Sequence, residues 1–169
     1  MRESAPLSKF TIFFSLYIVI SASFMLQLNN FLINILGQEK VKFLFFCLFY
    51  SVSIFYTTFV IFKTVNIIKA FLSVFVFAIA YVLISKQQLF AEKFHVLEYG
   101  ILGYLALRDI TKANSMRFIN ILYALFFAVL VSFADEGFQK LLPYRVCDIK
   151  DVITNAISGL LGIFLYCII

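Results

Sequence analysis

Long apolar segments alternate with short polar links along almost the whole chain. The apolar segments cover residues 10–28, 41–62, 67–84, 90–107, 116–134 and 151–169. Most approach the roughly 20 residues that a helix needs to cross a bilayer, and none shows the strict alternation typical of a strand. The pattern therefore predicts an all-α, polytopic transmembrane bundle of about six spans, with residues 1–169 forming a single membrane domain.

The first apolar segment allows two interpretations. Ser21-Ala22-Ser23 loosely resembles the small-residue cleavage site of a signal peptide. The apolar run continues through residues 24–26, however, which favours a retained helix over residues 10–28. Residues 29–42 are polar to amphipathic and contain Gly37, so we expect a loop with a short interfacial piece.

Composition supports a membrane protein and excludes several other classes. The chain is 63% hydrophobic and only 14% charged, which leaves too little polar surface for a soluble domain. The net charge of +5 suits anionic lipid headgroups, and no basic cluster with interleaved aromatic residues indicates nucleic acid. Cys47, Cys147 and Cys167 show no metal-binding spacing.

The orientation in the membrane is not decided by a simple count of basic residues. With a cytoplasmic amino terminus, the basic residues divide equally between the two faces. If the basic residues that lie among the carboxylates are present to pair with them, they should be left out of the count. The other basic residues then favour a cytoplasmic amino terminus. The carboxylate-rich face would then be extracytoplasmic.

Topology brings most of the unusual polar residues to one membrane face. The link between the third and fourth segments and the link between the fifth and sixth must lie on the same side. Spacings of three and four place polar side chains on one helix face within each segment. These residues are His95, Glu98 and Tyr99, then Asp135 and Gln139, with Glu136 at the same helix end, and finally Asp148, Asp151 and Asn155.

Their positions within the helices separate ordinary from unusual carboxylates. Asp148 and Asp151 begin a helix, where the positive end of the dipole favours acids. Asp135 and Glu136 lie at the opposite end of a helix, where the dipole disfavours them, and they require partners such as Arg145, Lys140 or a metal ion. Small residues in the same segments permit close helix packing; they are Gly100, Gly103, Ser158, Gly159 and Gly162.

At these residues the sequence resembles the VanZ-like family of small bacterial membrane proteins. The ordered set consists of His95, Glu98-Tyr99, Gly103, Asp135-Glu136, Gln139, Pro143, Arg145, Asp148, Asp151, Asn155 and Gly159, within residues 90–165. Only Val146-Cys147 separates the arginine from the first aspartate, where family members often have a serine- or glycine-rich segment. The resemblance implies a protein of the bacterial cell membrane linked to resistance to the glycopeptide teicoplanin, without an established biochemical activity.

The polar residues suggest roles by their chemistry. Candidate catalytic residues are His95, Glu98, Asp135, Glu136 and Asp151, which can exchange protons with a substrate. Candidate substrate-binding residues are Tyr99, Gln139, Arg145, Asp148 and Asn155, with the arginine suited to a phosphate or carboxylate. A divalent cation such as magnesium or calcium, held by Asp135, Glu136, Asp148 and Asp151, is a further hypothesis.

Three functional classes remain open at this point. The first is an enzyme that acts at the membrane face on a lipid-linked or cell-wall substrate. The second is a binding or accessory membrane protein without turnover, and the third is a polar network that only fixes helix register. Transport is disfavoured because the polar residues gather at one face and form no path across the bilayer. The oligomeric state is left open.

Overall fold

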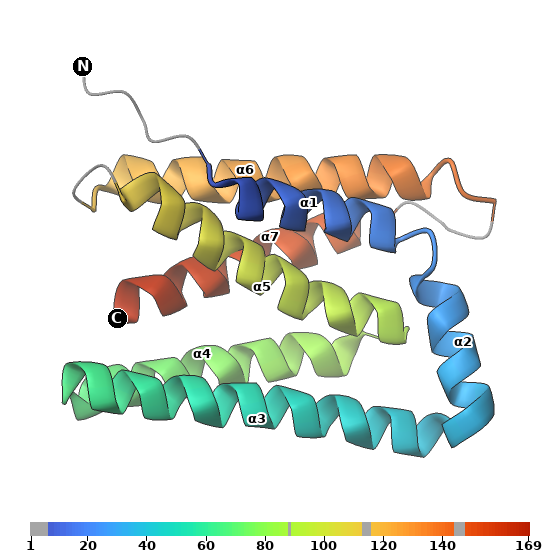
Figure 1. The fold of residues 1–169 in the computed structure, drawn as a ribbon, viewed down its shortest axis with the longest axis horizontal. Coiled ribbons are helices and arrows are strands. Elements are labelled where there is room, and N and C mark those ends of the chain that lie inside the picture. The colour runs from blue at the N-terminus through green and yellow to red at the C-terminus, as the bar shows by residue number, and fades with distance from the viewer. Residues whose placement is uncertain (1–6, 88, 113–115, 144–147) are drawn as a thin grey trace.

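The computed structural model describes residues 7–87, 89–112, 116–143 and 148–169, and the regular structure in these ranges is wholly helical. The helices are α1 (Lys9–Ser21), α2 (Met25–Leu36), α3 (Gln38–Thr64), α4 (Ile67–Lys86), α5 (Phe90–Thr111), α6 (Phe118–Gln139) and α7 (Ile149–Ile168). Helices α3 and α4 form a hairpin on one side, while α1, α5, α6 and α7 gather on the other. Helix α2 crosses between the two groups at one end (Figure 1). The all-helical prediction is confirmed.

Most of the helices are suited to cross a membrane. By length and composition, α3, α4, α6 and α7 qualify as spans, and the bent pair of α1 and α2 would add a fifth. Helix α5 lies outside this set and carries charged residues near both of its ends. Helix α5 contributes side chains to all three buried hydrophobic clusters, which makes it the most enclosed helix. The charged residues near its ends therefore belong to a helix that packs inside the bundle. This arrangement is roughly compatible with the expected six spans.

The first expected span is broken into two helices. Helix α1 ends at Ser21 and α2 begins at Met25, and the two axes differ in direction by 66°. The Ser21 and Ser23 hydroxyls donate to the carbonyls of Ile18 and Ile20, three residues earlier, at 2.7 Å each. Such bonds give the backbone an alternative to continuing the helix. Residues 29–42 are accordingly helical apart from Gly37, where we had expected a loop with a short interfacial piece.

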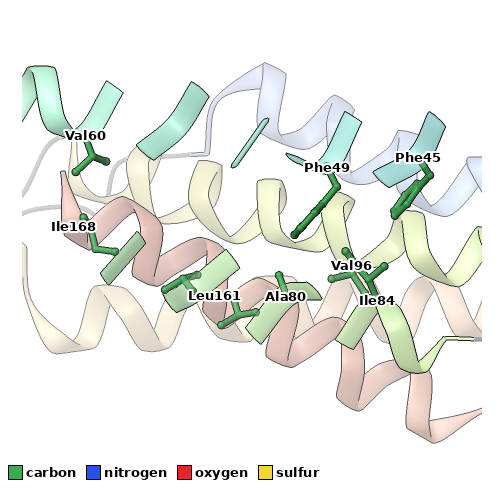
Figure 2. Close-up of a cluster of buried hydrophobic side chains, with 9 residues drawn as sticks. Phe45, Phe49, Val60, Ala80, Ile84, Val96, Leu161 and Ile168 are labelled. Atoms are coloured by element: carbon green, nitrogen blue, oxygen red, sulfur yellow. The ribbon is translucent and has the colours of Figure 1, made fainter. Parts of the chain in front are cut away.

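The α3–α4 hairpin attaches to the rest of the bundle through one hydrophobic cluster. Figure 2 shows its side chains, which come from four different helices. The Tyr56 hydroxyl of α3 also donates to the Leu165 carbonyl of α7. The members of the cluster are Phe45, Phe49, Val60, Val76, Ala80, Ile84, Val96, Leu161 and Ile168.

Helices α5 and α7 meet at backbone distance. A Cβ atom added to Gly103 would overlap the carbonyl of Gly159, and one added to Gly162 would overlap the carbonyl of Gly100. The Gly159 position is also tight, because an added Cβ would lie 3.1 Å from the Ala128 Cβ of α6. The expected close packing of these small residues is therefore present, and it fixes where the polar beginnings of both helices lie.

This crossing generates a stability prediction. Gly103→Ala or Gly162→Ala should lower the melting temperature of the purified protein in detergent, because overpacking a tight contact costs about 1–3 kcal/mol or more. Gly137→Ala on α6 is the matched control, since no atom lies within 4 Å of an added Cβ there. Alanine is the better helix former, so this control should be neutral or slightly stabilising. Equal melting temperatures for Gly103→Ala and Gly137→Ala would contradict the steric argument.

Candidate functional site

The polar residues meet at the end of the bundle that α2 crosses. Helices α5 and α7 begin there and α6 ends there (Figure 1). The two polar links thus lie at the same end, as the topology argument expected. We call His95, Glu98, Tyr99 and Asp135 the acid–histidine cluster; all four side chains are buried.

His95 and Glu98 form a pair one turn apart on α5. The distance from His95 Nδ1 to Glu98 Oε2 is 3.0 Å, and the two residues are only 4% and 6% exposed. A carboxylate at Nδ1 orients the imidazole ring and directs Nε2 away from it. From α1, the Tyr17 side chain also faces the Glu98 carboxylate.

Asp135 brings a second carboxylate to the same imidazole from α6. Its Oδ2 atom lies 3.9 Å from His95 Nε2 and accepts a hydrogen bond of 3.2 Å from the Tyr99 hydroxyl. Asp135 is fully buried, and its Oδ1 atom has no hydrogen-bond partner among the described residues. The imidazole therefore lies between two buried carboxylates, of which one still has an open acceptor.

Glu136 has a different set of contacts. It accepts a hydrogen bond from the Asp148 backbone N–H at 3.2 Å and another from the Gln139 side-chain amide at 3.3 Å. Asp148 in turn caps α7, because its side chain accepts from the Lys150 N–H at 2.9 Å. Glu136, Gln139 and Asp148, which we call the α6–α7 clasp, join the end of α6 to the start of α7. The helix-start explanation of Asp148 agrees with this geometry.

The remaining candidates on α7 lie beside these groups. The Asn155 amide donates to the Ser132 hydroxyl of α6 at 3.0 Å, and both residues are buried. Asp151 is half-buried one turn earlier and is an electrostatic neighbour of Glu136. Arg145 and Cys147 lie outside the described residues, whereas Lys140 is exposed at the end of α6.

The described carboxylates do not form a metal site. Within the described ranges, no three His, Cys, Asp or Glu side chains are arranged to hold a metal ion. The proposed ligand set of Asp135, Glu136, Asp148 and Asp151 is not gathered into such a group in the described ranges, and a cation at these residues stays a prediction.

Two apolar hollows lie on other faces of the bundle. One, of about 480 Å³, lies between α4 and α7, and its lining includes Lys69, Phe75 and Leu161. The other, of about 580 Å³, lies on α3 and α4 around Tyr50 and Tyr81. Neither hollow is lined by a residue of the acid–histidine cluster.

A second polar group, which the sequence analysis missed, lies at the opposite end of α5. Asp109 is 1% exposed and accepts from the Ser8 backbone N–H at 3.0 Å and from the Thr11 hydroxyl at 2.5 Å. Arg108 and Lys112 supply positive charge at 3.0 and 3.2 Å. The signal was present in the sequence, because Asp109 is an acid at the carboxyl end of a helix, as Asp135 and Glu136 are.

These features define a multi-pass helical membrane protein with a polar cluster enclosed at one end of the bundle. A family model described as VanZ/LLP1 matches residues 5–169, and the chain belongs to this family. The resemblance inferred from the polar motifs is thereby confirmed, and the match extends over the amino-terminal helices as well. Comparison with curated proteins and with solved structures found no match.

The Asp109 group yields a prediction about the anchoring of α1. Thr11→Val keeps the side-chain shape but removes the hydroxyl that donates to Asp109. The variant should lose about 1–3 kcal/mol of stability, because a buried carboxylate then lacks one donor. Thermal unfolding in detergent measures the loss, with Thr58→Val at an exposed position of α3 as the matched control. A Thr11→Val protein as stable as the control would show that the contact is energetically unimportant.

Proposed function

We propose that this protein is an enzyme of the bacterial cell envelope that acts on a lipid-linked or cell-wall substrate at the extracytoplasmic face. The observation that carries the proposal is the position of His95 between the Glu98 and Asp135 carboxylates, with two different helices supplying the acids. Desolvated carboxylates around an imidazole are unusual outside functional sites in membrane proteins.

The geometry suggests a division of roles. Glu98 orients the ring through Nδ1, so that Nε2 can exchange a proton with a substrate group. Tyr99 holds one oxygen of Asp135, which leaves Oδ1 as the acceptor for a substrate donor. In this scheme His95 and Asp135 are the reacting pair and Glu98 and Tyr99 position them.

The other candidates take supporting roles in the proposal. The α6–α7 clasp sets the start of α7 relative to α6, and Asn155 reinforces the same junction through Ser132. Asp151 remains a candidate acid beside Glu136. Arg145 is kept as the group that would bind a phosphate or carboxylate of the substrate, since an arginine does this with two parallel hydrogen bonds.

The location of the cluster favours an amphiphilic substrate. The cluster lies at one end of a bundle whose outer surface is rich in exposed aliphatic and aromatic side chains, as expected for contact with lipid. A molecule with a lipid tail and a polar head could present its head at that depth. The family link to teicoplanin resistance agrees with a cell-wall or lipid-linked target.

A non-catalytic function remains a second candidate. The observation that favours it is the α6–α7 clasp, in which Glu136 is engaged by donors from the protein itself. A binding protein or a purely structural network would show such internal pairing throughout. The distinction then depends on whether the acid–histidine cluster is needed for activity or only for stability.

Substitution within the cluster tests the enzyme proposal. His95→Gln and Asp135→Asn should each reduce the resistance or lipid phenotype of producing cells at least about tenfold, because an acid–base group typically contributes roughly 10²–10⁴-fold to a reaction rate. The envelope lipids of cells with and without the protein would be compared by mass spectrometry, and teicoplanin susceptibility would be scored in parallel. Glu39→Gln, at an exposed residue of α3, is the control and should behave as wild type.

Stability measurements separate the alternatives in the same set of variants. An enzyme should lose activity while its melting temperature in detergent stays within a few degrees of wild type. If the activity loss instead follows the loss of stability from variant to variant, the polar residues form a structural network and the enzyme proposal is wrong. Specific ligand binding without any product would favour the binding protein.

The proposed orientation has its own test. In a background without native cysteines, Lys140→Cys near the cluster should react with a membrane-impermeant maleimide applied to intact cells. Lys112→Cys, at the opposite end of the bundle, should react only after the cells are opened. Labelling of position 112 from outside would reverse the orientation and place the cluster at the cytoplasmic face.

A further inference from the structure

The acid–histidine cluster is closed to the surroundings. His95, Glu98, Tyr99 and Asp135 are 4%, 6%, 0% and 0% exposed, respectively. The two apolar hollows described above are lined by other residues. A substrate can therefore reach His95 only if a part of the protein moves.

Helix α2 is our candidate for that movement, while α1 contacts the cluster directly through Tyr17 and Ile18. Helix α2 runs across the end of the bundle where α5 begins, and it packs against α3 and α5 (Figure 1). Both of its ends are corners of the backbone. The 66° bend at residues 22–24 precedes it, and Gly37, with a φ of +84° that a residue without a side chain tolerates, follows it.

The three faces of α2 have different chemistry. Met25 and Asn29 are buried against the bundle. A stripe of apolar side chains remains exposed along one flank, made of Phe24, Leu28, Phe31 and Ile35. A stripe of uncharged polar side chains is exposed beside it, made of Gln27, Asn30 and Asn34. Such a helix is suited to lie in the interface between lipid and water, with its apolar flank in the lipid.

In the closed position of α2, the hydrogen bonding of the buried Asn29 side chain is incomplete. Its side chain is 7% exposed, and within the described part of the chain its Oδ1 atom has no hydrogen-bond partner. A buried acceptor without a donor opposes burial, because the same atom would be hydrogen-bonded if water or a ligand reached it. Of the two buried residues of α2, Met25 and Asn29, the asparagine thus favours opening.

We infer that α2 is a hinged cover over the acid–histidine cluster and that an amphiphilic, lipid-borne substrate reaches His95 beneath it from the adjoining leaflet. The nature of the substrate rests on the proposed function, but the movement of α2 does not. The apolar stripe keeps α2 in contact with lipid while its inner face separates from α5. The cover thereby links access to the cluster with the lipid layer that would carry the substrate.

The single histidine of the chain gives a direct measure of access to the cluster. Full-length protein in lipid nanodiscs would be treated with diethyl pyrocarbonate, and the modification of His95 followed with time by peptide mass spectrometry. Modification of the Lys42 side chain, which is 44% exposed, serves as an internal standard for reagent activity. The assay reads the opening of the cover without any substrate.

Three variants of α2 test the inference. Asn29→Leu removes the unpaired acceptor and should slow the modification of His95 by about fivefold or more, the effect expected when one buried unsatisfied group is eliminated. Asn29→Asp places a charge in the same buried position and should accelerate it. Asn30→Leu, on the exposed face of the same helix, is the matched control and should leave the rate unchanged.

The outcomes are distinguishable from those of the enzyme test. Equal rates for wild type and Asn29→Leu, or equal slowing by Asn30→Leu, would overturn the hinged cover even if His95→Gln abolishes the phenotype. Conversely, the expected order of rates would stand even if His95 proves to have no catalytic role. Melting temperatures of all three variants confirm that each is folded, and Asn29→Asp tests the inference in the opposite direction if Asn29→Leu is unstable.

Discussion

Helices α5 and α7 cross so closely that glycine is required on both sides of the contact. Gly103 faces Gly159 and Gly162 faces Gly100, each through a backbone carbonyl that leaves no space for a Cβ atom. In a membrane, where lipid chains are as apolar as the helix surfaces, such packing is a main source of helix association. The crossing fixes the register of α5 against α7. Helix α6 then packs onto α7 through Ala128 and Ser132, and Ala128 also lies in a buried cluster with Tyr99 of α5. Because of this register, the helical turns of α5, α6 and α7 that carry the polar groups lie at the same level along the bundle, and the polar groups meet there.

The cost of the polar cluster explains why α5 is enclosed. Carboxylates that face lipid are strongly disfavoured, and the described residues place Glu98 and Asp135 on either side of one histidine, with Glu136 also buried inside the bundle. Helix α5 is surrounded by α1, α6 and α7 and approached by α4. The outer helices supply the apolar surface that α5 lacks, so the bundle can keep charged side chains within the membrane.

The sequence predicted the helical class, the family and the grouping of polar residues at one end, because these depend on hydropathy, motif order and chain topology. The spacing of His95 and Glu98 was sufficient to place them on one helix face. The bend after Ser21 was not predicted, since it arises from serine hydroxyls that bond to the backbone within an otherwise continuous apolar run. The sequence also could not predict that Asp135 and Glu136 have different contacts. Neighbouring residues on a helix point in different directions, and only the positions of α5 and α7 decide which groups each of them meets. The roles of these residues in function remain a prediction.

The contact between Thr11 and Asp109 has a consequence for how the protein is made. The two residues are separated by 98 positions in the chain, so α1 enters the membrane long before its partner has been synthesised. Until then, the Thr11 hydroxyl must be satisfied within the helix or by water and lipid headgroups, whereas the Ser15 and Ser21 hydroxyls donate to the carbonyls of Ile12 and Ile18 within α1 itself. The amino-terminal helix is therefore held provisionally during biosynthesis and acquires its final place only when α5 arrives, before α6 and α7 join the bundle.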